Sequence, residues 1–206
     1  KSASAPFDAR DPRLYGSVLY PGGKFRGTAC LLQAGQAYEE NGVWKFRTGE
    51  LNSVDADGNV ITSINGPKYS NQQFINKTGF YFRKFLDESA GSSMRGGARS
   101  DMWWPYFRVA EAYMIACEAA FETGDGASAL TYINKVRARA GVQPLQTVTF
   151  DNIVHENAVE FAFEFHRWWD LKRWRLADKV FNGNSSDRAS RHRMLWPYLV
   201  VDPGNP

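Results

Sequence analysis

The sequence predicts a mostly α-helical protein, with helices paired as in tetratricopeptide repeats and an N-terminal part that is irregular, loop-rich and partly β. Two observations favour this fold class. Apolar residues recur with helical spacing between about residues 103 and 180, whereas glycines and short turn signals gather before residue 102. We therefore divide the 206 residues into a loop-rich region at 1–102, the candidate ligand-facing part, and a helical block at 103–206 with an irregular C-terminal tail.

The helical block contains three apolar stripes with the same spacing of i, i+4, i+7 and i+11. They consist of Val109, Tyr113, Ala116 and Ala120, then Ala129, Ile133, Val136 and Ala140, then Val154, Ala158, Phe161 and Phe165. Gly124 ends the first helix, Asp125 caps the second, and Gly141 with Pro144 ends the second. A fourth helix is expected from His166 to about Lys179. Because the third stripe repeats the first, we expect an internal repeat of helix pairs, with Ala116, Ala120, Ile133 and Val136 buried against one another.

Turn signals divide the first hundred residues into short segments. They lie at Pro21–Gly23, Asn41–Gly42, Asp57–Asn59 and Asn65–Pro67, between β-prone runs such as Ser17–Tyr20. These segments are expected to form hairpins and long loops. A glycine-rich stretch at 89–97 has little to bury and is predicted as a mobile surface loop between the two halves.

Composition excludes several classes of protein. The net charge is only +3, which does not favour a nucleic-acid partner. No apolar run approaches the length of a membrane span. Cys30 and Cys117 lie far apart without a C-x-x-C spacing, so neither a thioredoxin-like motif nor a zinc ribbon is present.

Glu156, Glu160 and Glu164 lie four residues apart on one strip of the third helix. Paired carboxylates are what glycoside hydrolysis requires, but the two groups must flank a sugar from opposite sides. With Arg137, Arg139, Arg167 and Arg173 nearby in sequence, an ion-pair network is the simpler interpretation.

Possible metal motifs are incomplete. His155–Glu156 begins a zinc-protease signature, but Val159 stands where the second histidine belongs. His166 and Asp170 have no visible third ligand, and Asp55–Asn59 resembles a hairpin turn more than a calcium loop. We therefore expect no catalytic residue, no metal and no cofactor.

Four segments, in order and spacing, resemble the SusD/RagB family of outer-membrane nutrient-binding lipoproteins. They are Arg10–Arg13 (R-D-P-R), Phe107–Tyr113, Tyr132–Gly141 and Glu160–Trp174. The last run is the most specific, and it departs from the family pattern at Phe165, where a glycine is usual. The resemblance covers the C-terminal half of family members, which are about twice as long as this chain.

The resemblance implies a non-catalytic protein at the cell surface. Family members are lipoproteins of the outer membrane that cover a SusC-like TonB-dependent transporter and capture oligosaccharides for uptake. Two alternatives stay open: a member that binds peptides, and a tetratricopeptide-type scaffold that binds other proteins. A glycoside hydrolase would need two carboxylates across a cleft.

Exposed aromatic rings on loops are the expected ligand contacts, because the apolar face of a sugar stacks on a ring. Trp44, Tyr38, Tyr69 and Tyr81 meet this description in the first half of the chain. Trp44 ranks first, since it lies between Gly42 and the polar residues Lys45 and Arg47. Trp103 and Trp104 are expected to be packing residues.

The resemblance also implies that further helix pairs belong to the complete fold. A helix pair of this kind does not bury its apolar stripes alone. We therefore expect the chain to associate with a missing N-terminal half of the same protein or with another copy.

Overall fold

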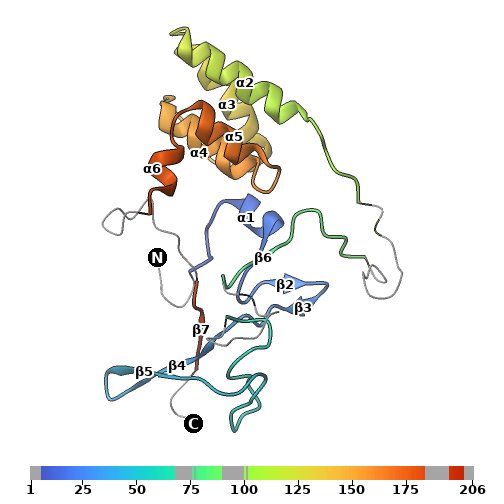
Figure 1. Cartoon of the computed structure of the whole chain (residues 1–206), viewed down its shortest axis with the longest axis vertical. Helices are drawn as coiled ribbons and strands as arrows, with labels where there is room; N and C mark the ends of the chain where they lie inside the picture. The colour runs from blue at the N-terminus through green and yellow to red at the C-terminus, as the bar shows by residue number, and fades with distance from the viewer. Residues whose placement is uncertain are drawn as a thin grey trace. The chain divides into compact units, whose positions relative to one another are not determined.

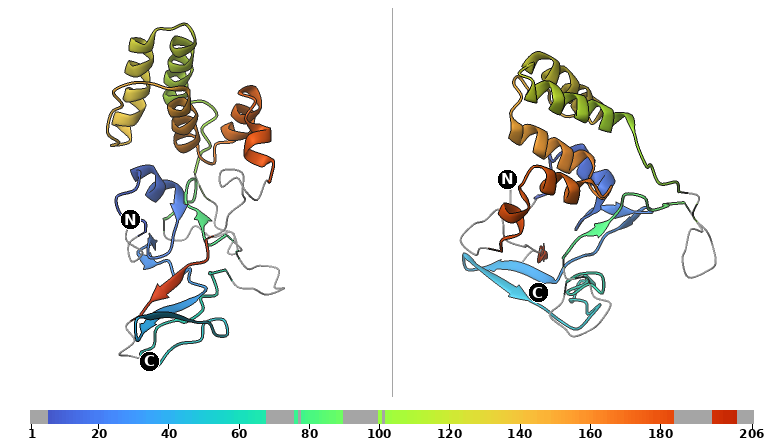
Figure 2. Two further views of the ribbon diagram at one scale, coloured as in Figure 1. Left: turned by 90° about the vertical axis from the view of Figure 1, so that its left-hand side faces the viewer. Right: turned by 45° about the horizontal axis from the view of Figure 1, so that its top comes forward.

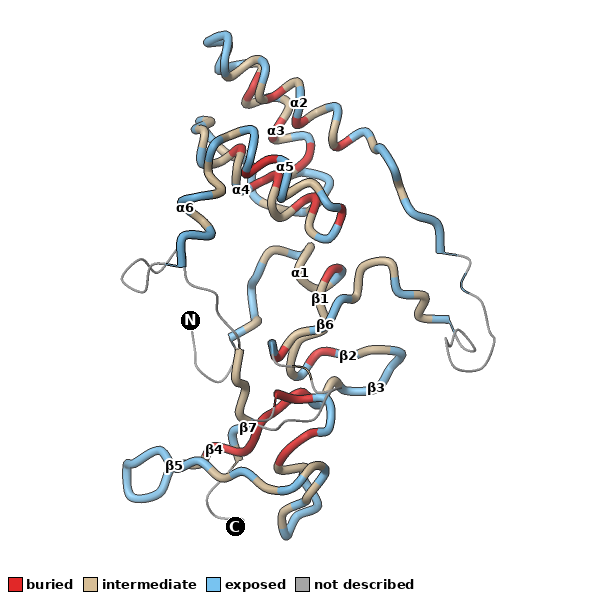
Figure 3. Tube along the Cα trace, in the orientation of Figure 1, coloured by how far each residue is buried: buried red, intermediate tan, exposed pale blue. Residues whose placement is uncertain are grey.

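The computed structural model describes residues 6–67, 76, 78–89, 100, 102–183 and 195–201. The chain divides into two compact units, each with its own core (Figures 1 and 3). Unit 1 comprises Lys1–Asp8, Val18–Ser100 and Arg193–Pro206, and unit 2 comprises Ala9–Ser17 and Asp101–His192. The units therefore interleave along the chain. The glycine-rich stretch predicted as a loop lies outside the described residues, apart from Ser89.

Unit 2 is helical. Its helices are α1 (Pro12–Ser17), α2 (Val109–Glu122), α3 (Gly126–Arg139), α4 (Phe150–Glu160), α5 (His166–Arg173) and α6 (Ala177–Phe181). In the described part of the chain, no helix has both the length and the apolar character that crossing a membrane requires. The mixed, mainly helical character of the fold agrees with the sequence, and the tetratricopeptide-like pairing stays a prediction.

Local signals set the helix ends. The Asp125 side chain accepts a hydrogen bond from the Ser128 amide at 3.0 Å, so the predicted cap of α3 is confirmed. Thr149 and Asn152 form a reciprocal capping box at the start of α4, which binds two amides that have no partner within the helix. Gly124 ends α2 with φ +82°, in the left-handed region that favours glycine.

The core of unit 2 lies between α2, α3 and α4. Met114, Cys117, Ile133 and Ile153 are its fully buried side chains. Burial of Ile133 and Val136 was predicted correctly, but the predicted stripe of α2 is wrong by one position. The residues that face the core are Ala110, Met114 and Cys117, while Val109 is 68% exposed and Ala116 and Ala120 are only partly buried. Two neighbouring stripes of similar hydrophobicity run along this helix, and the sequence pattern selected the outer one.

The third stripe is also corrected by the structure. Phe161 is buried as expected, but Val154 and Ala158 are only partly buried and Phe165 is 77% exposed. Helix α4 ends at Glu160, and Phe163 and Phe165 then adopt φ of 66° and 63°. A left-handed residue breaks the helical period, so a stripe cannot extend through it. Glycine adopts such a φ without strain, which fits the glycine that the resemblance implies at position 165.

A network of ion pairs lies on the buried face of α4. Because this face carries glutamates, a hydrophobic pattern does not identify it. Arg13 of α1 donates through Nη1 to Glu156 at 2.6 Å and to Glu160 at 2.9 Å, while its other nitrogens bind Asp11. Arg108 binds Glu160 at 2.5 Å, and it holds both oxygens of Glu164 at 2.8 and 3.0 Å. All three glutamates are buried, so their charges depend on these partners.

The predicted arginine partners of this network are half correct. Arg137 binds Glu156 and Arg139 binds Glu160, each at 2.7 Å. Arg173 instead binds Glu118 and Asp170, and the Arg167 side chain donates to the Val154 carbonyl oxygen. Arg13 and Arg108 take the positions that the sequence analysis gave to Arg167 and Arg173.

Unit 1 contains small antiparallel pairs and one larger sheet. Its strands are β1 (Val18–Leu19), β2 (Lys24–Phe25), β3 (Thr28–Ala29), β4 (Gly35–Glu40), β5 (Val43–Arg47), β6 (Tyr81–Phe82) and β7 (Tyr198–Val200). Strands β1 and β6 pair, as do β2 and β3, and the three-stranded sheet has the order β5-β4-β7. In Figure 2, β7 runs beside β4, to which it is parallel. The turn predicted near Asp57–Asn59 is present, with an antiparallel bridge between Val54 and Val60.

Replacing Ile133 by Ala should destabilise the helical unit by about 2–5 kcal/mol, because the cavity left by a fully buried side chain closes only in part. Ile115→Ala is the matched control. Ile115 is exposed on α2, and its loss should cost under about 0.5 kcal/mol. Urea unfolding followed by circular dichroism measures both, and equal losses would contradict the assignment of the core.

Replacing Arg13 by Ala should cost about 3 kcal/mol, because two buried carboxylates lose a partner at once. Arg139→Ala removes a contact to the same Glu160, yet the Arg139 side chain is largely exposed and its loss should cost under about 1 kcal/mol. Arg13→Lys should be nearly as harmful as Arg13→Ala, since one ammonium cannot reproduce the forked contacts. A small loss for Arg13→Ala would refute the structural role of the network.

Unit 2 should lose stability in acid. Burial alone would raise the pKa of Glu160, but hydrogen bonds from Arg108 and Arg13 outweigh it and hold the pKa below its ordinary value of 4.5. A carboxylate with a lowered pKa contributes stability above its unfolded pKa and loses it as the pH falls through its folded pKa. Stability attributable to Glu160 should therefore be constant above about pH 5 and decline below it. Melting curves of the native chain and of Glu160→Gln from pH 3 to 7 test this, since the two should converge only in acid.

Candidate functional site

The three-stranded sheet of unit 1 presents one face of exposed aromatic rings. In the antiparallel register, Trp44 lies opposite Glu39 and Phe46 lies opposite Ala37. Residues directly opposite each other share a face, and residues two apart on a strand do too. Trp44 and Phe46 therefore project from the same side of β5, and they are 50% and 61% exposed.

Small residues on the central strand let rings from the outer strands meet. Phe46 of β5 and Tyr198 of β7 lie on opposite sides of β4, yet their ring centroids are 4.9 Å apart. Beneath them lie Gly35 and Ala37. A Cβ at position 35 would come within 3.1 Å of Cε1 of Tyr198 and would clash with the Arg47 carbonyl oxygen. We call Trp44, Phe46 and Tyr198 the aromatic row.

The turn of the hairpin fixes this arrangement. Asn41 and Gly42 have φ of 55° and 76°, as a two-residue turn between twisted strands requires. Trp44 is the second residue after that turn, and alternation along β5 then places Phe46 on the same side. The sequence analysis did not include Phe46, although its spacing from Trp44 was a usable signal. No sequence signal pointed to Tyr198, because its strand pairs with a segment far away in the chain.

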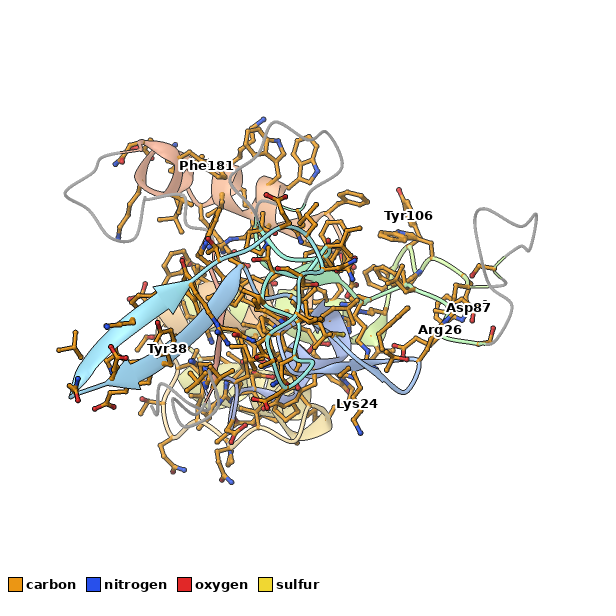
Figure 4. All side chains as sticks on the ribbon, turned by 90° about the horizontal axis from the view of Figure 1, so that it is seen from below. Lys24, Arg26, Tyr38, Asp87, Tyr106 and Phe181 are labelled. Atoms are coloured by element: carbon orange, nitrogen blue, oxygen red, sulfur yellow. The ribbon has the colours of Figure 1, made fainter. Side chains whose placement is uncertain are left out.

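Tyr38, which is labelled in Figure 4, lies on β4, and the register of the hairpin puts it on the other face of the sheet from Trp44. The guanidinium carbon of Arg47 lies 5.9 Å from the centre of its ring. Arg47 is itself held by Gln36 at 2.7 Å and by the buried Asp55 at 3.3 Å. The structure therefore does not bring Tyr38 together with Trp44.

Tyr81 lies on β6 in a different part of unit 1, and Tyr69 lies outside the described residues. The Tyr81 hydroxyl donates a hydrogen bond to the Asn65 carbonyl at 2.9 Å. Its ring lines a largely apolar cavity of about 440 Å³, together with Phe25, Leu31 and Ile64. Burial raises the pKa of the Tyr81 hydroxyl, which therefore stays a neutral donor.

Unit 2 has a cavity of about 660 Å³ between α2 and α5. Its carboxylates include Glu118 and Glu164, but each already has an arginine partner, Arg173 for Glu118 and Arg108 for Glu164. Glu111, Glu122 and Asp170 also line the cavity, whose basic side chains are Arg173 and His166, so acidic groups outnumber basic ones there.

The other aromatic residues of unit 2 differ from expectation. Trp103 and Trp104 were expected to pack, but they are 74% and 47% exposed. Tyr106, which is labelled in Figure 4, is exposed as well. Trp104 contacts the ring of Phe165 with centroids 5.4 Å apart.

Glu156 and Glu160 are not available as the acid and base that a glycosidase would need. Glu156 and Glu160 are buried, and all four of their carboxylate oxygens accept hydrogen bonds from arginines. An acid in this state cannot donate a proton to a glycosidic oxygen. Within the residues that the structure describes, no three side chains of the metal-binding types lie close enough to hold an ion.

Known proteins similar in sequence carry SusD names. The chain is 34% identical over 128 residues to the SusD-like protein P2 of Formosa agariphila, covering 56% of this chain and 25% of that protein. It is 42% identical over 71 residues to the starch-binding protein SusD of Bacteroides thetaiotaomicron, covering 34% of this chain and 12% of that protein. The chain thus spans a quarter or less of these two relatives.

Solved structures share the fold. A SusD-like carbohydrate binding protein of Bacteroides fragilis superimposes with a TM-score of 0.61 and 22% identity, over 97% of this chain and 39% of that one. A second SusD-like protein of the same species gives a TM-score of 0.57 with 23% identity, over 84% of this chain and 29% of that one.

A sequence model of the SusD family matches residues 1–197, nearly the whole chain. This match agrees with both comparisons above. It also agrees with the motifs at Arg10–Arg13 and Glu160–Trp174, which contribute the central ion pairs of unit 2. The chain therefore belongs to the SusD family.

Proposed function

We propose that this chain is the glycan-binding part of a non-catalytic surface protein, and that the aromatic row of Trp44, Phe46 and Tyr198 is its sugar platform. The observation that carries the proposal is a row of exposed rings on a three-stranded sheet. Ordinary exposed side chains are scattered singly, whereas a contiguous group of rings indicates a binding surface. A relative named starch-binding protein matches part of the chain, which supports carbohydrate as the ligand.

The geometry of the row suits an extended sugar chain. Trp44 and Phe46 are two residues apart on one strand, which separates their attachment points by roughly 7 Å. Phe46 is supported from the side by Tyr198, so its ring is held rather than free to rotate. A platform that is fixed in advance loses little entropy when ligand binds.

Tyr38 and Tyr81 belong to the proposal as secondary contacts. The Tyr38 ring is half-buried and lies near Arg47. Tyr81 lines the apolar cavity of unit 1. A ligand that reached either residue would extend beyond the aromatic row.

Capture at the cell surface would serve uptake. The family resemblance implies an outer-membrane lipoprotein that covers a SusC-like TonB-dependent transporter, which supports this part of the proposal. We propose the same location and partner for the protein to which this chain belongs, with its ligand released to the transporter unchanged. The neutralised carboxylates of unit 2 support the non-catalytic part of this proposal.

Trp44→Ala should weaken oligosaccharide binding by about 1–2 kcal/mol, because the largest exposed ring of the row is lost. Calorimetry with an oligosaccharide chosen on a glycan array measures the loss. Trp103→Ala is the matched control, since it removes an exposed indole from unit 2 and should leave the affinity unchanged.

An unaltered affinity for Trp44→Ala would remove the row from the proposed function. Release of new reducing ends during a long incubation would overturn its non-catalytic part. Circular dichroism of both variants checks that the hairpin still folds.

A further inference from the structure

We propose that the aromatic row selects uncharged glycans, and that Glu39 is the side chain that discriminates against sugars bearing carboxylate or sulfate groups. This inference rests on the proposed function, because it names the substrate class of the same surface. The argument depends on which charges share a face with the row.

Glu39 lies directly opposite Trp44 in the register of the hairpin. Side chains in this relation have Cβ atoms about 5 Å apart, so the carboxylate stands beside the indole. Glu39 is exposed, and no ion pair to it is found among the residues that the structure describes. Its negative charge therefore faces any ligand that stacks on Trp44.

The cations of the hairpin lie on the other face. Lys45 and Arg47 alternate with Trp44 and Phe46, so they project from the opposite side of β5. Both are already engaged, Lys45 with Glu40 and Arg47 with Asp55. The pairing with Glu40 raises the pKa of Lys45, which keeps its charge.

On the row's own face, the three strands carry one charged residue. Besides the aromatic row, this face consists of Gly35, Ala37, Glu39 and Val200 in the described strands. The local potential is thus negative. A carboxylate accepts hydrogen bonds from sugar hydroxyls but repels a uronate or a sulfate ester nearby. Neutral sugars gain a polar contact where acidic sugars meet a like charge.

The test uses ligands that differ only in charge. Oligogalacturonate hexamers and their fully methyl-esterified forms make one such pair, and the best neutral oligosaccharide from a glycan array with its sulfated derivative makes another. The native chain should bind the uncharged member of each pair at least about tenfold more tightly at low salt, with the ratio shrinking as salt screens the charge.

Substitutions then assign the effect to one residue. Glu39→Gln should reduce the preference to under about threefold, and Glu39→Lys should reverse it, because charge rather than shape is altered. Glu40→Gln is the matched control, since that neighbouring carboxylate projects to the other face and should leave the preference unchanged.

The outcomes separate the two proposals. Glycan binding with equal or greater affinity for the acidic members, or a preference that survives Glu39→Lys, overturns the role of Glu39 while the platform stands. No binding of any glycan by the native chain overturns both. Binding of neutral members only, abolished by Trp44→Ala and relaxed by Glu39→Gln, supports both.

Discussion

The helical unit depends on the guanidinium group of Arg13. That one group bonds to Asp11 and to two buried carboxylates of α4, Glu156 and Glu160, which lie far away in the chain. Two buried acids without a cation would be strongly destabilising, and a buried arginine without acids equally so. Each element therefore requires the other: Arg13 needs the carboxylates of α4, and α4 turns a face inward whose buried glutamates are bound by arginines. Arg108 at the start of α2 and Arg137 of α3 extend the same requirement to the neighbouring helices. The motifs that the chain shares with the SusD family therefore contribute to one network of arginine–glutamate ion pairs.

The sequence predicts the buried faces of unit 2 where apolar residues are buried, but not where charged residues are buried. Apolar periodicity correctly predicted the buried face of α3, because Ala129, Ile133 and Val136 form its one hydrophobic stripe. It failed on α2, where two adjacent stripes have similar hydrophobicity, and on α4, where the buried face includes Glu156, Asn157 and Glu160. No hydropathy pattern identifies a helix face that is buried because it is charged. The spacing of the three glutamates did predict an ion-pair network, but it could not name Arg13, whose position depends on tertiary structure.

The ligand surface shows the same division between local and long-range information. The hairpin of β4 and β5 could be read from Asn41–Gly42 and the alternating residues around it, and Trp44 was identified on that basis. Phe46 was within reach of the same reasoning. The third ring, Tyr198, comes from a strand that pairs in parallel with β4 across most of the chain. Parallel partners are not joined by a turn, so nothing in the intervening sequence indicates their register. Two groups leave no room for a side chain at position 35, the Arg47 carbonyl oxygen and the Tyr198 ring, and only the first belongs to the hairpin.

Two kinds of carboxylate separate the stabilising role from the proposed binding role in this chain. In unit 2, Glu156, Glu160 and Glu164 are buried and bound by arginines, so their charges stabilise the packing of the helices. In unit 1, Glu39 is exposed and lies opposite the exposed indole of Trp44. A charge that the fold does not need can change without loss of structure, whereas a change at Glu160 would disturb several helices at once. Selection for a different glycan would therefore act on the face of the sheet, at positions such as Glu39, while the arginine network stays fixed. The physical separation of these two roles is what lets one scaffold present different ligand surfaces.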